Sequence, residues 1–336
     1  MKAVILAGGA GSRLQPLSDD ETPKHLLNLC SPVKSLLQQT FERINNLCPA
    51  ENIITVTNSK HAQTVKSQLD KLSRGSIVLS EPAGRNTAPA IASALEYLMQ
   101  AHKSDDIVLI APSDHLIKNT PKFIETVNEA VQYARKDYLA LFGIKPSYPE
   151  TGYGYIKASG NYAERFVEKP DLKTAEQYLK EGCYYWNSGM FAGKISVFLE
   201  EFQKYAPEIY SNVKQLDFSG GMQISREIYE KMPSVSIDYA VMEKSKRIAL
   251  VPLKSDWNDL GSFQSLYSVC PKDENGNVIR GSAVLDNVKN SYIYSDEGCI
   301  YACGIENSAI VKKKDKIMVL SLDCAQNVKK LFEKPL

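Results

Sequence analysis

The feature that most constrains this chain is an apolar run near its N-terminus that stops abruptly at glycines. Residues 3–7 read Ala-Val-Ile-Leu-Ala, and residues 8–11 read Gly-Gly-Ala-Gly. This pattern predicts a buried strand and a following loop whose backbone comes close to another group. Glycine has no Cβ and tolerates positive φ, so successive N–H groups can turn toward an anion. Because Arg13 and Lys24 add positive charge, the pattern predicts a site for a di- or triphosphate.

Two common phosphate-binding loops do not match this segment. The dinucleotide fingerprint G-x-G-x-x-G can start at Gly9, but Leu14 stands where the third glycine is required. The Walker pattern needs Gly-Lys followed by Ser or Thr, and this tripeptide occurs nowhere in the chain. The sequence therefore argues against a dinucleotide-binding dehydrogenase.

Composition excludes several other classes of protein. The 336 residues are 43% hydrophobic and 24% charged, which suits one large domain and a smaller one. The net charge of +1 is not that of a nucleic-acid-binding face, and we expect Lys312–Lys314 to form a solvated turn. No apolar stretch approaches the roughly 20 residues that span a bilayer, and the apolar N-terminal run is too short for a signal peptide. We expect no nucleic-acid partner and no membrane association.

The cysteine pattern indicates the redox compartment. The chain has 7 cysteines, an odd number, and none of them form a Cys-x-x-Cys motif. We interpret all of them as reduced thiols, mostly buried, in a cytoplasmic protein.

Hydrophobic patterning predicts alternating strands and helices over the first part of the chain. Expected strands cover residues 52–57, 77–80, 106–111 and 139–143, and expected helices cover residues 35–46, 61–72, 88–102 and 122–135. Because these strands are continuous apolar runs, the pattern predicts a parallel sheet covered by helices on both faces.

The later part of the chain has a different pattern. Short antiparallel strands are expected at 152–156 and 163–168, and a helix at 237–245 precedes a strand at 248–253. A polar, turn-rich segment follows at 271–277 and marks a domain boundary. We therefore predict a catalytic domain over residues 1–270 and a second domain of short β segments over residues 281–336.

Candidate site residues follow the predicted strands. In an open parallel sheet, ligands bind at the carboxyl ends of the strands, where we expect Gly8, Glu81, Asp114 and Asp259. Two carboxylates with phosphate oxygens and waters suit Mg²⁺, so Asp114 and Asp259 are candidate metal ligands. Each aspartate alone also fits a helix cap or a turn.

Glu81 is a candidate for recognition of a base. A carboxylate offers two adjacent acceptors, and guanine presents two adjacent donors, its N1–H and its amino group. A mismatched base would leave buried polar groups unpaired, so such a pairing discriminates strongly. The alternative is a surface glutamate before Pro82. We interpret His115 as structural, and Trp186 and Trp257 as core residues.

These motifs, taken in order, resemble those of the mannose-1-phosphate guanylyltransferases, or GDP-mannose pyrophosphorylases, of the sugar-phosphate nucleotidyltransferase family. The resemblance covers nearly the whole chain. It is carried by residues 6–13, 22–24, 81–90, 112–115, 151–156, 166–170, 186–191, 236–243 and 257–261. The sequence departs from the family at Gln15, where relatives often carry Trp, and at His25-Leu26, where they often carry Gln-Phe.

The resemblance implies an α/β fold. It consists of a Rossmann-like, mostly parallel sheet with helices on both faces, followed by a small C-terminal left-handed β-helix-like domain. The implied activity is transfer of GMP from GTP to mannose 1-phosphate, with Mg²⁺ as the metal. A different sugar 1-phosphate such as a manno-heptose phosphate, a different base, and a non-catalytic GDP-sugar-binding subunit stay open as alternatives, and so does a homodimer.

The resemblance also implies a role for each matching residue. Arg13, Lys24 and Lys169 are implied as catalytic cations, and Asp114 and Asp259 as metal ligands. Nucleotide binding is implied for Leu6, Ala7, Gly8, Gly9, Gly11, Ser12, Glu81, Pro82, Gly84, Arg85, Asn86 and Ser113. Sugar binding is implied for Gly152, Tyr153, Glu168, Asn187 and Gly189.

Overall fold

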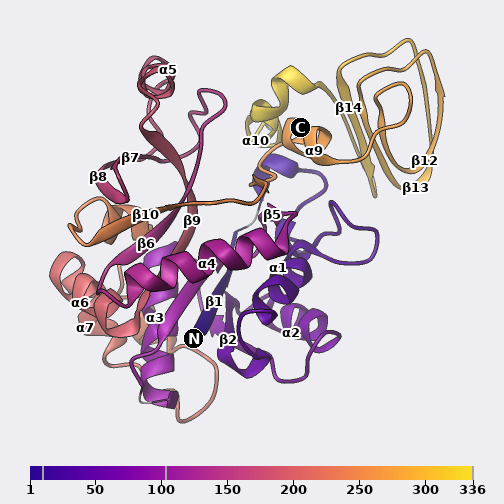
Figure 1. The fold of residues 1–336 in the computed structure, drawn as a ribbon. Helices are drawn as coiled ribbons and strands as arrows, with labels where there is room; N and C mark the ends of the chain where they lie inside the picture. The colour runs from indigo at the N-terminus through magenta and orange to yellow at the C-terminus, as the bar shows by residue number, and fades with distance from the viewer. Residues whose placement is uncertain (10, 103, 335–336) are drawn as a thin grey trace. The chain divides into compact units, whose positions relative to one another are not determined.

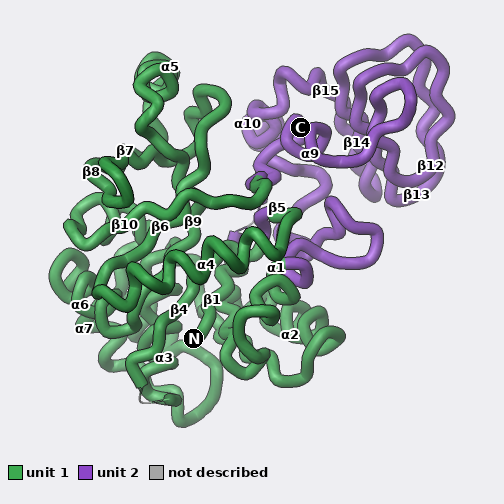
Figure 2. Tube along the Cα trace, viewed as in Figure 1, with its two compact units in different colours: residues 1–8, 40–113, 117–257 green, residues 9–39, 114–116, 258–336 purple. Residues whose placement is uncertain are grey.

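The structure, a computed structural model, describes residues 1–9, 11–102 and 104–334. Its described residues fall into two compact units, drawn in different colours in Figure 2. Unit 1 comprises residues 1–8, 40–113 and 117–257, and unit 2 comprises residues 9–39, 114–116 and 258–336. The chain therefore passes from one unit to the other after residues 8, 39, 113, 116 and 257, the first time within the predicted phosphate loop.

The sheet of unit 1 contains nine strands among its described residues, in the order β3-β2-β1-β4-β9-β6-β10-β8-β7. The strands are β1 (Lys2–Ala7), β2 (Ile53–Asn58), β3 (Ile77–Glu81), β4 (Ile107–Pro112), β6 (Leu139–Ile144), β7 (Tyr155–Ser159), β8 (Tyr162–Val167), β9 (Tyr184–Lys194) and β10 (Ile248–Pro252). The four neighbours β3-β2-β1-β4 are parallel, as is the pair β6-β10. The predicted parallel sheet is confirmed for these strands. The sequence did not predict that β9 lies antiparallel between β4 and β6, which makes the whole sheet mixed.

The α-helices among the described residues between 36 and 229 are α1 (Leu36–Asn45), α2 (Ala62–Asp70), α3 (Thr87–His102), α4 (Thr120–Ala134), α5 (Leu172–Glu181), α6 (Ile195–Tyr205), α7 (Pro207–Val213) and α8 (Arg226–Tyr229). In Figure 1, α4 crosses in front of the sheet, while α5 stands apart from it at the top. Successive strand residues point to opposite faces. Val4 of β1 shares a core cluster with α3, whereas its buried neighbour Ile5 lies outside that cluster. Both faces are thus buried, which explains why the strands are continuous apolar runs.

The helix predicted over residues 237–245 is shorter and differently wound. The structure has a π-helical turn, η4 (Asp238–Met242), at this position. Single π-helical turns occur frequently at functional sites. Among the described residues, no helix combines the length and apolar character required to cross a membrane.

Unit 2 contains a second sheet, with the strand order β12-β13-β14-β15 among its described residues. The strands are β12 (Val278–Asp286), β13 (Tyr292–Cys303), β14 (Ser308–Lys313) and β15 (Lys316–Ser321), accompanied by α9 (Phe263–Val269), the 3₁₀ helix η5 (Leu322–Asn327) and α10 (Val328–Phe332). The first three strands are parallel, as in a β-helix, and β15 is antiparallel to β14. Asn287, Asn290 and Asn307 turn the chain between strands with positive φ, a conformation that asparagine tolerates better than most residues.

The core of unit 2 joins the N-terminal loop segment to the C-terminal part of the chain. Leu14, Leu17 and Leu29 share one buried cluster with Phe263 and Tyr292. The division into compact units therefore differs from the predicted domain limits, since residues 9–39 and 258–270 belong to unit 2. The domain limits at residues 270 and 281 stay a prediction.

The prediction that Lys312–Lys314 form a solvated turn is wrong for Lys313, whose ammonium group contacts other residues of unit 2. Its ammonium group donates to the carbonyl oxygen of Leu17 at 2.6 Å and lies 3.5 Å from the Asp19 carboxylate. Only 13% of its side chain is exposed. Lys313 therefore ties the β14–β15 turn to the loop between Arg13 and Lys24.

The cysteines confirm one prediction and correct another. All seven lie among the described residues, and all are free thiols. However, only Cys48 and Cys270 are buried, and Cys299, Cys303 and Cys324 are exposed. The expectation that most of them are buried is wrong. Cys299 and Cys303 lie in β13, a strand with many exposed positions, and Cys324 lies in the 3₁₀ helix η5.

Candidate functional site

The first group of candidate residues lies in unit 1, at the carboxyl ends of β1 and β4. Leu6 of β1 pairs with Pro112 of β4, and its carbonyl oxygen accepts a hydrogen bond from the Ser113 N–H at 3.0 Å. The Ala7 carbonyl accepts from the Thr57 hydroxyl at 2.8 Å, and Gly8, which follows, is exposed. The strand ends are therefore fixed, while the glycine after β1 stays open to a ligand.

Glu81 ends β3 in the same unit, but its surroundings differ from those of a surface glutamate. Its side chain is buried, and one carboxylate oxygen, Oε1, accepts a hydrogen bond from the hydroxyl of fully buried Tyr229. The other oxygen, Oε2, lies 3.6 Å from the position that a Cβ would take at Gly8. Burial raises the pKa of Glu81 to about 7, although the hydrogen bond from Tyr229 acts in the opposite direction.

The segment after Glu81 is held by backbone contacts. The Pro82 carbonyl accepts from the Arg226 guanidinium at 3.0 Å, and the Arg85 guanidinium donates to the Met232 carbonyl at 3.1 Å. Gly84 and Asn86 are exposed, and Asn86 has a positive φ of 65°. The turn before α3 is thus tied at two points and leaves polar groups at its surface.

Asn187 is the centre of a second group of contacts in unit 1. Its amide nitrogen donates to the Asp238 carboxylate at 2.8 Å, and its side-chain oxygen accepts from the Gly189 N–H at 3.0 Å. Burial raises the pKa of Asp238 to about 6, and the nearby charge of Glu168 adds to this rise. Gly189 has a φ of 68°, a conformation that favours glycine.

Glu168 belongs to the same group. A Cβ at Gly154 would lie 2.5 Å from its Oε2, and the backbone N–H of Asn187 donates to the Gly154 carbonyl at 2.8 Å. Lys169 pairs with Glu168 at 2.7 Å, and its N–H donates to the carbonyl of Tyr153. The structure therefore brings Tyr153, Glu168, Lys169, Asn187 and Gly189 together. Gly152 lies next to Tyr153, and its N–H donates to the Glu150 carboxylate at 2.7 Å.

The glycine loop continues in unit 2, where Gly11 has a left-handed backbone with φ 69°. A Cβ at this position would lie 2.5 Å from the Cβ of Lys24, so only glycine fits. The Gly11 carbonyl accepts from the Ser18 hydroxyl at 2.6 Å, and the 3₁₀ turn η1 (Ser12–Leu14) carries half-buried Arg13. Gly9 is exposed, and Ala10 lies outside the described residues.

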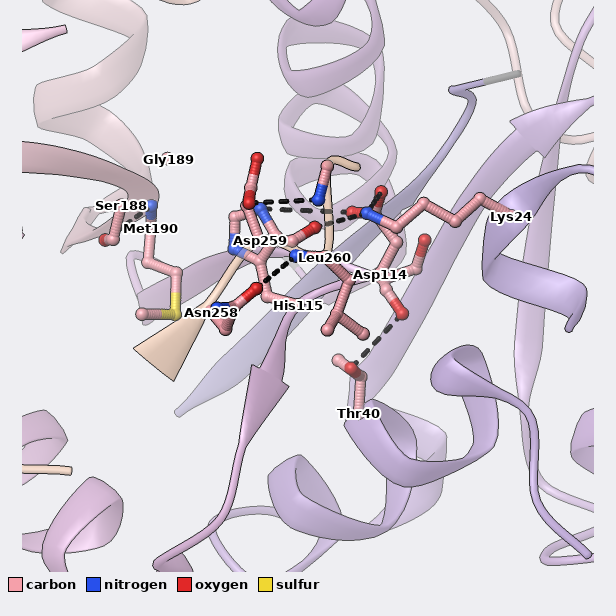
Figure 3. Close-up of polar contacts among 12 residues, drawn as sticks. Lys24, Thr40, Asp114, His115, Ser188, Gly189, Met190, Asn258, Asp259 and Leu260 are labelled. Carbon is pink, nitrogen blue, oxygen red and sulfur yellow. Dashed lines mark hydrogen bonds and ion pairs between the residues drawn. The ribbon is translucent and has the colours of Figure 1, made fainter. Parts of the chain in front are cut away.

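Lys24 connects the two candidate metal ligands of unit 2 (Figure 3). Its ammonium group pairs with Asp114 Oδ2 at 2.7 Å and also donates to the backbone carbonyl of Asp259. Burial acts to raise the pKa of Asp114, but the charges of Lys24 and His115 outweigh it and hold that pKa well below its usual range. The Asp259 carboxylate accepts from the Gly261 N–H at 3.0 Å. The buried cation thus contacts both aspartates, one through its carboxylate and the other through its backbone.

Two family models match the chain. Residues 2–276 match the nucleotidyl transferase family, and residues 281–334 match the mannoseP isomerase/GMP-like β-helix domain. Mannose-1-phosphate guanylyltransferases from Klebsiella pneumoniae and Escherichia coli are 42% and 41% identical to this chain. In both cases the alignment covers 98% of this chain and 73% of the relative. The chain belongs to the mannose-1-phosphate guanylyltransferases.

A solved structure supports the same assignment for the fold. The protein from Thermus thermophilus, described as a mannose-1-phosphate geranyltransferase, superposes with a TM-score of 0.88 at 29% identity. The match covers 99% of this chain and 98% of that one. The Rossmann-like sheet and the β-helix-like domain expected from the sequence are therefore confirmed as the architecture of this guanylyltransferase family member.

Nucleotidyl transferases of this family generally use a divalent metal ion. Within residues 1–9, 11–102 and 104–334, no cluster of three or more His, Cys, Asp or Glu side chains is placed to hold one. Asp114 and Asp259, however, offer hard oxygen donors, and Mg²⁺ commonly takes one or two carboxylates and completes its shell with substrate phosphates and waters. The donor set of this guanylyltransferase therefore fits such an ion.

Sequence reasoning missed one buried and one partly buried contact. Tyr229, which donates a hydrogen bond to Glu81, belongs to no recognisable motif, and its sequence context carries no signal of its role. Asp238, which accepts a hydrogen bond from the Asn187 side chain, lies in the Ser236–Glu243 motif. Its place in that motif was the one sequence signal of a role for Asp238. In both cases the partner lies far away in sequence.

The raised pKa of Glu81 leads to a prediction about stability. Folding favours the protonated carboxyl, so this stabilisation is present below the unfolded pKa of 4.5 and is lost as the pH rises through about 7. Between pH 4 and pH 8 the loss is about 3 kcal/mol. Because glutamine is neutral throughout, Glu81→Gln should become more stable relative to the wild type as the pH rises. Urea denaturation at pH 5 and pH 8 measures this difference.

The matched control for this prediction is Glu164→Gln, which neutralises an exposed glutamate of β8. The control should leave the pH dependence unchanged. Identical changes of unfolding free energy with pH in Glu81→Gln and the wild type would contradict the prediction.

Proposed function

We propose that the protein transfers GMP from GTP to mannose 1-phosphate, forming GDP-mannose and releasing pyrophosphate. The observation that carries this proposal is the 42% identity over 98% of the chain to a mannose-1-phosphate guanylyltransferase. The intact Lys24, Asp114 and Asp259 cluster supports it, because a chain without transferase activity has no need to retain it.

In this proposal the glycine loop and the charged residues after it bind the nucleotide phosphates. The N–H groups of Gly9, Gly11 and Ser12 and the guanidinium of Arg13 contact the phosphate oxygens. Lys24, already buried beside a carboxylate, neutralises charge at the α-phosphate. Asp114 and Asp259 would hold Mg²⁺, which would supply additional neutralisation of phosphate charge.

A second set of residues binds the guanine base and the sugar in this proposal. Glu81 accepts from guanine, with Pro82, Gly84, Arg85 and Asn86 beside it and with Leu6, Ala7, Gly8 and Ser113 at the strand ends. Glu168, Asn187, Gly189, Gly152 and Tyr153 hold the mannose hydroxyls. Exposed Lys169 contacts the phosphate of mannose 1-phosphate.

The reaction requires that the two substrates are aligned and that the negative charge of their phosphates is neutralised. A phosphate oxygen of mannose 1-phosphate attacks the α-phosphorus of GTP, the new P–O bond forms, and the bond to the β-phosphate oxygen breaks as pyrophosphate leaves. Because the attacking oxygen is already anionic, no general base is needed. Arg13, Lys24 and Lys169 supply positive charge where negative charge develops.

A substrate panel tests this proposal. Pyrophosphate release is measured with GTP, ATP, CTP and UTP, each combined with mannose, glucose and manno-heptose 1-phosphates. The pair of GTP and mannose 1-phosphate should give the highest kcat/KM. A higher value for another sugar or base would change the substrate assignment, and tight GDP-mannose binding without turnover would identify a regulatory subunit instead.

Location and assembly stay predictions from the sequence. We propose a cytoplasmic homodimer in which Mg²⁺ is the physiological metal. The free state of all seven cysteines supports a reducing compartment. Analytical ultracentrifugation tests the dimer, and activity with Mg²⁺, Mn²⁺ and Co²⁺ after chelation tests the metal.

A further inference from the structure

The contact between Tyr229 and Glu81 is the basis of a further inference. Tyr229 ends the short helix α8 and is 0% exposed, and Glu81 is 5% exposed. The phenol donates to Glu81 Oε1, so this oxygen has a fixed direction. The second oxygen, Oε2, lies toward Gly8, where the absence of a Cβ leaves room. The carboxylate is therefore held with one oxygen engaged by the protein and the other directed to the strand end.

The backbone around both residues is tied together, so this contact is built into the fold. The Ser80 N–H donates to the Met222 carbonyl at 2.8 Å, and the Ile224 N–H donates to the Ser80 carbonyl at 3.0 Å. Arg226 adds its bond to the carbonyl of Pro82. The segment that carries Tyr229 thus continues the edge of the sheet beside β3.

We propose that Tyr229 is a positioning residue that sets base specificity by holding Glu81 as an oriented carboxylate. This inference rests on the proposed function, in which Glu81 contacts guanine. Each oxygen of an ionised carboxylate can accept two hydrogen bonds, so Oε1 can accept from Tyr229 and from a ligand at once. The two oxygens together then match the N1–H and amino donors of guanine. A protonated carboxyl presents one donor and one acceptor, and it matches the N1 acceptor and amino donor of adenine. A phenol that donates to the carboxylate favours the ionised form and hence guanine.

The surrounding charges agree with this role. Burial raises the pKa of Glu81 to about 7, so both protonation states are accessible near neutral pH. Burial and the charge of Glu81 raise the pKa of Tyr229, so the phenol keeps its proton and acts as a donor. The other charged groups nearby are Arg85, which acts on Tyr229, and Arg226, which pairs with Glu230 at 2.6 Å.

Equilibrium binding of GTP and ATP from pH 5.5 to pH 9 tests the inference in the wild-type chain, Tyr229→Phe and Tyr97→Phe. Tyr97→Phe is the matched control, because it also removes a hydroxyl from a buried tyrosine of the same core cluster. In the wild type, the preference for GTP over ATP should rise with pH around pH 7. In Tyr229→Phe this rise should shift upward by about one pH unit, since a hydrogen bond to a charged group is lost.

The outcomes separate this inference from the proposed function. At pH 7 the GTP affinity of Tyr229→Phe should fall about five-fold, and at pH 9 it should return to the wild-type value, which follows from a shift of one unit. An equal loss at every pH would show a structural role only and overturn the inference, as would a profile identical to that of Tyr97→Phe. A wild type that binds no GTP would overturn the proposed function and the inference with it.

Discussion

Replacing Lys24 with alanine is expected to lower kcat for GDP-mannose formation by roughly 10²–10³-fold, the range seen when one transition-state donor is removed. The ammonium group of Lys24 is buried and lies 2.7 Å from Asp114. A buried cation acts strongly on developing negative charge because little water screens it. Its loss should therefore affect kcat more than the KM for GTP. Steady-state kinetics with both substrates varied measure the two effects separately.

The design of the Lys24 experiment must separate chemistry from folding. A Cβ at Gly11 would approach the Cβ of Lys24, so the aliphatic part of the lysine packs against the loop. Lys24→Met retains this aliphatic part and removes only the charge, and it should lose as much activity as Lys24→Ala. Lys60→Ala, on an exposed lysine of unit 1, is the control. A rate close to that of the wild type in Lys24→Met would remove Lys24 from the mechanism.

The parts of the fold that the sequence predicted correctly depend on local pattern. Strand β1 and its glycines were recognisable because an apolar run and residues without a Cβ occur next to each other. The predicted strand at 77–80 and the helix at 88–102 are observed within one residue as β3 and α3. Gly11 shows how far this reasoning extends. The sequence indicates a glycine turn, and the structure adds that Lys24 is the neighbour that excludes a side chain.

The parts that the sequence did not predict depend on contacts between distant segments. The antiparallel strand β9 enters the sheet between β4 and β6, although nothing in its own sequence specifies those neighbours. Tyr229 and Glu81 are 148 positions apart, and Asp238 and Asn187 are 51 positions apart. Periodicity and turn chemistry act over a few residues, so they carry no information on such pairs.

Asp259 also differs from its expected position, and the reason is topological. We expected it at the carboxyl end of a strand in the main sheet. Strand β10, however, ends at Pro252, and Asp259 follows β11 (Trp257–Asn258), which pairs with the short strand β5 (Leu116–Ile117). Asp259 nevertheless contacts Lys24, through its backbone carbonyl. The contact with Lys24 thus uses the backbone of Asp259, whereas its carboxylate accepts from the Gly261 N–H.

Replacing Asp259 with asparagine separates these roles and is expected to lower kcat by roughly 10²–10³-fold at low Mg²⁺. The side-chain oxygen of asparagine can still accept from the Gly261 N–H, and the backbone carbonyl that contacts Lys24 is unchanged. The variant should therefore keep the turn and lose only the negative charge that we assign to the metal. Mg²⁺ titrations of the rate should show a higher concentration at half-maximal activity than in the wild type. Asp256→Asn, an exposed aspartate nearby, is the control, and a wild-type Mg²⁺ dependence in Asp259→Asn would show that Asp259 only forms a turn.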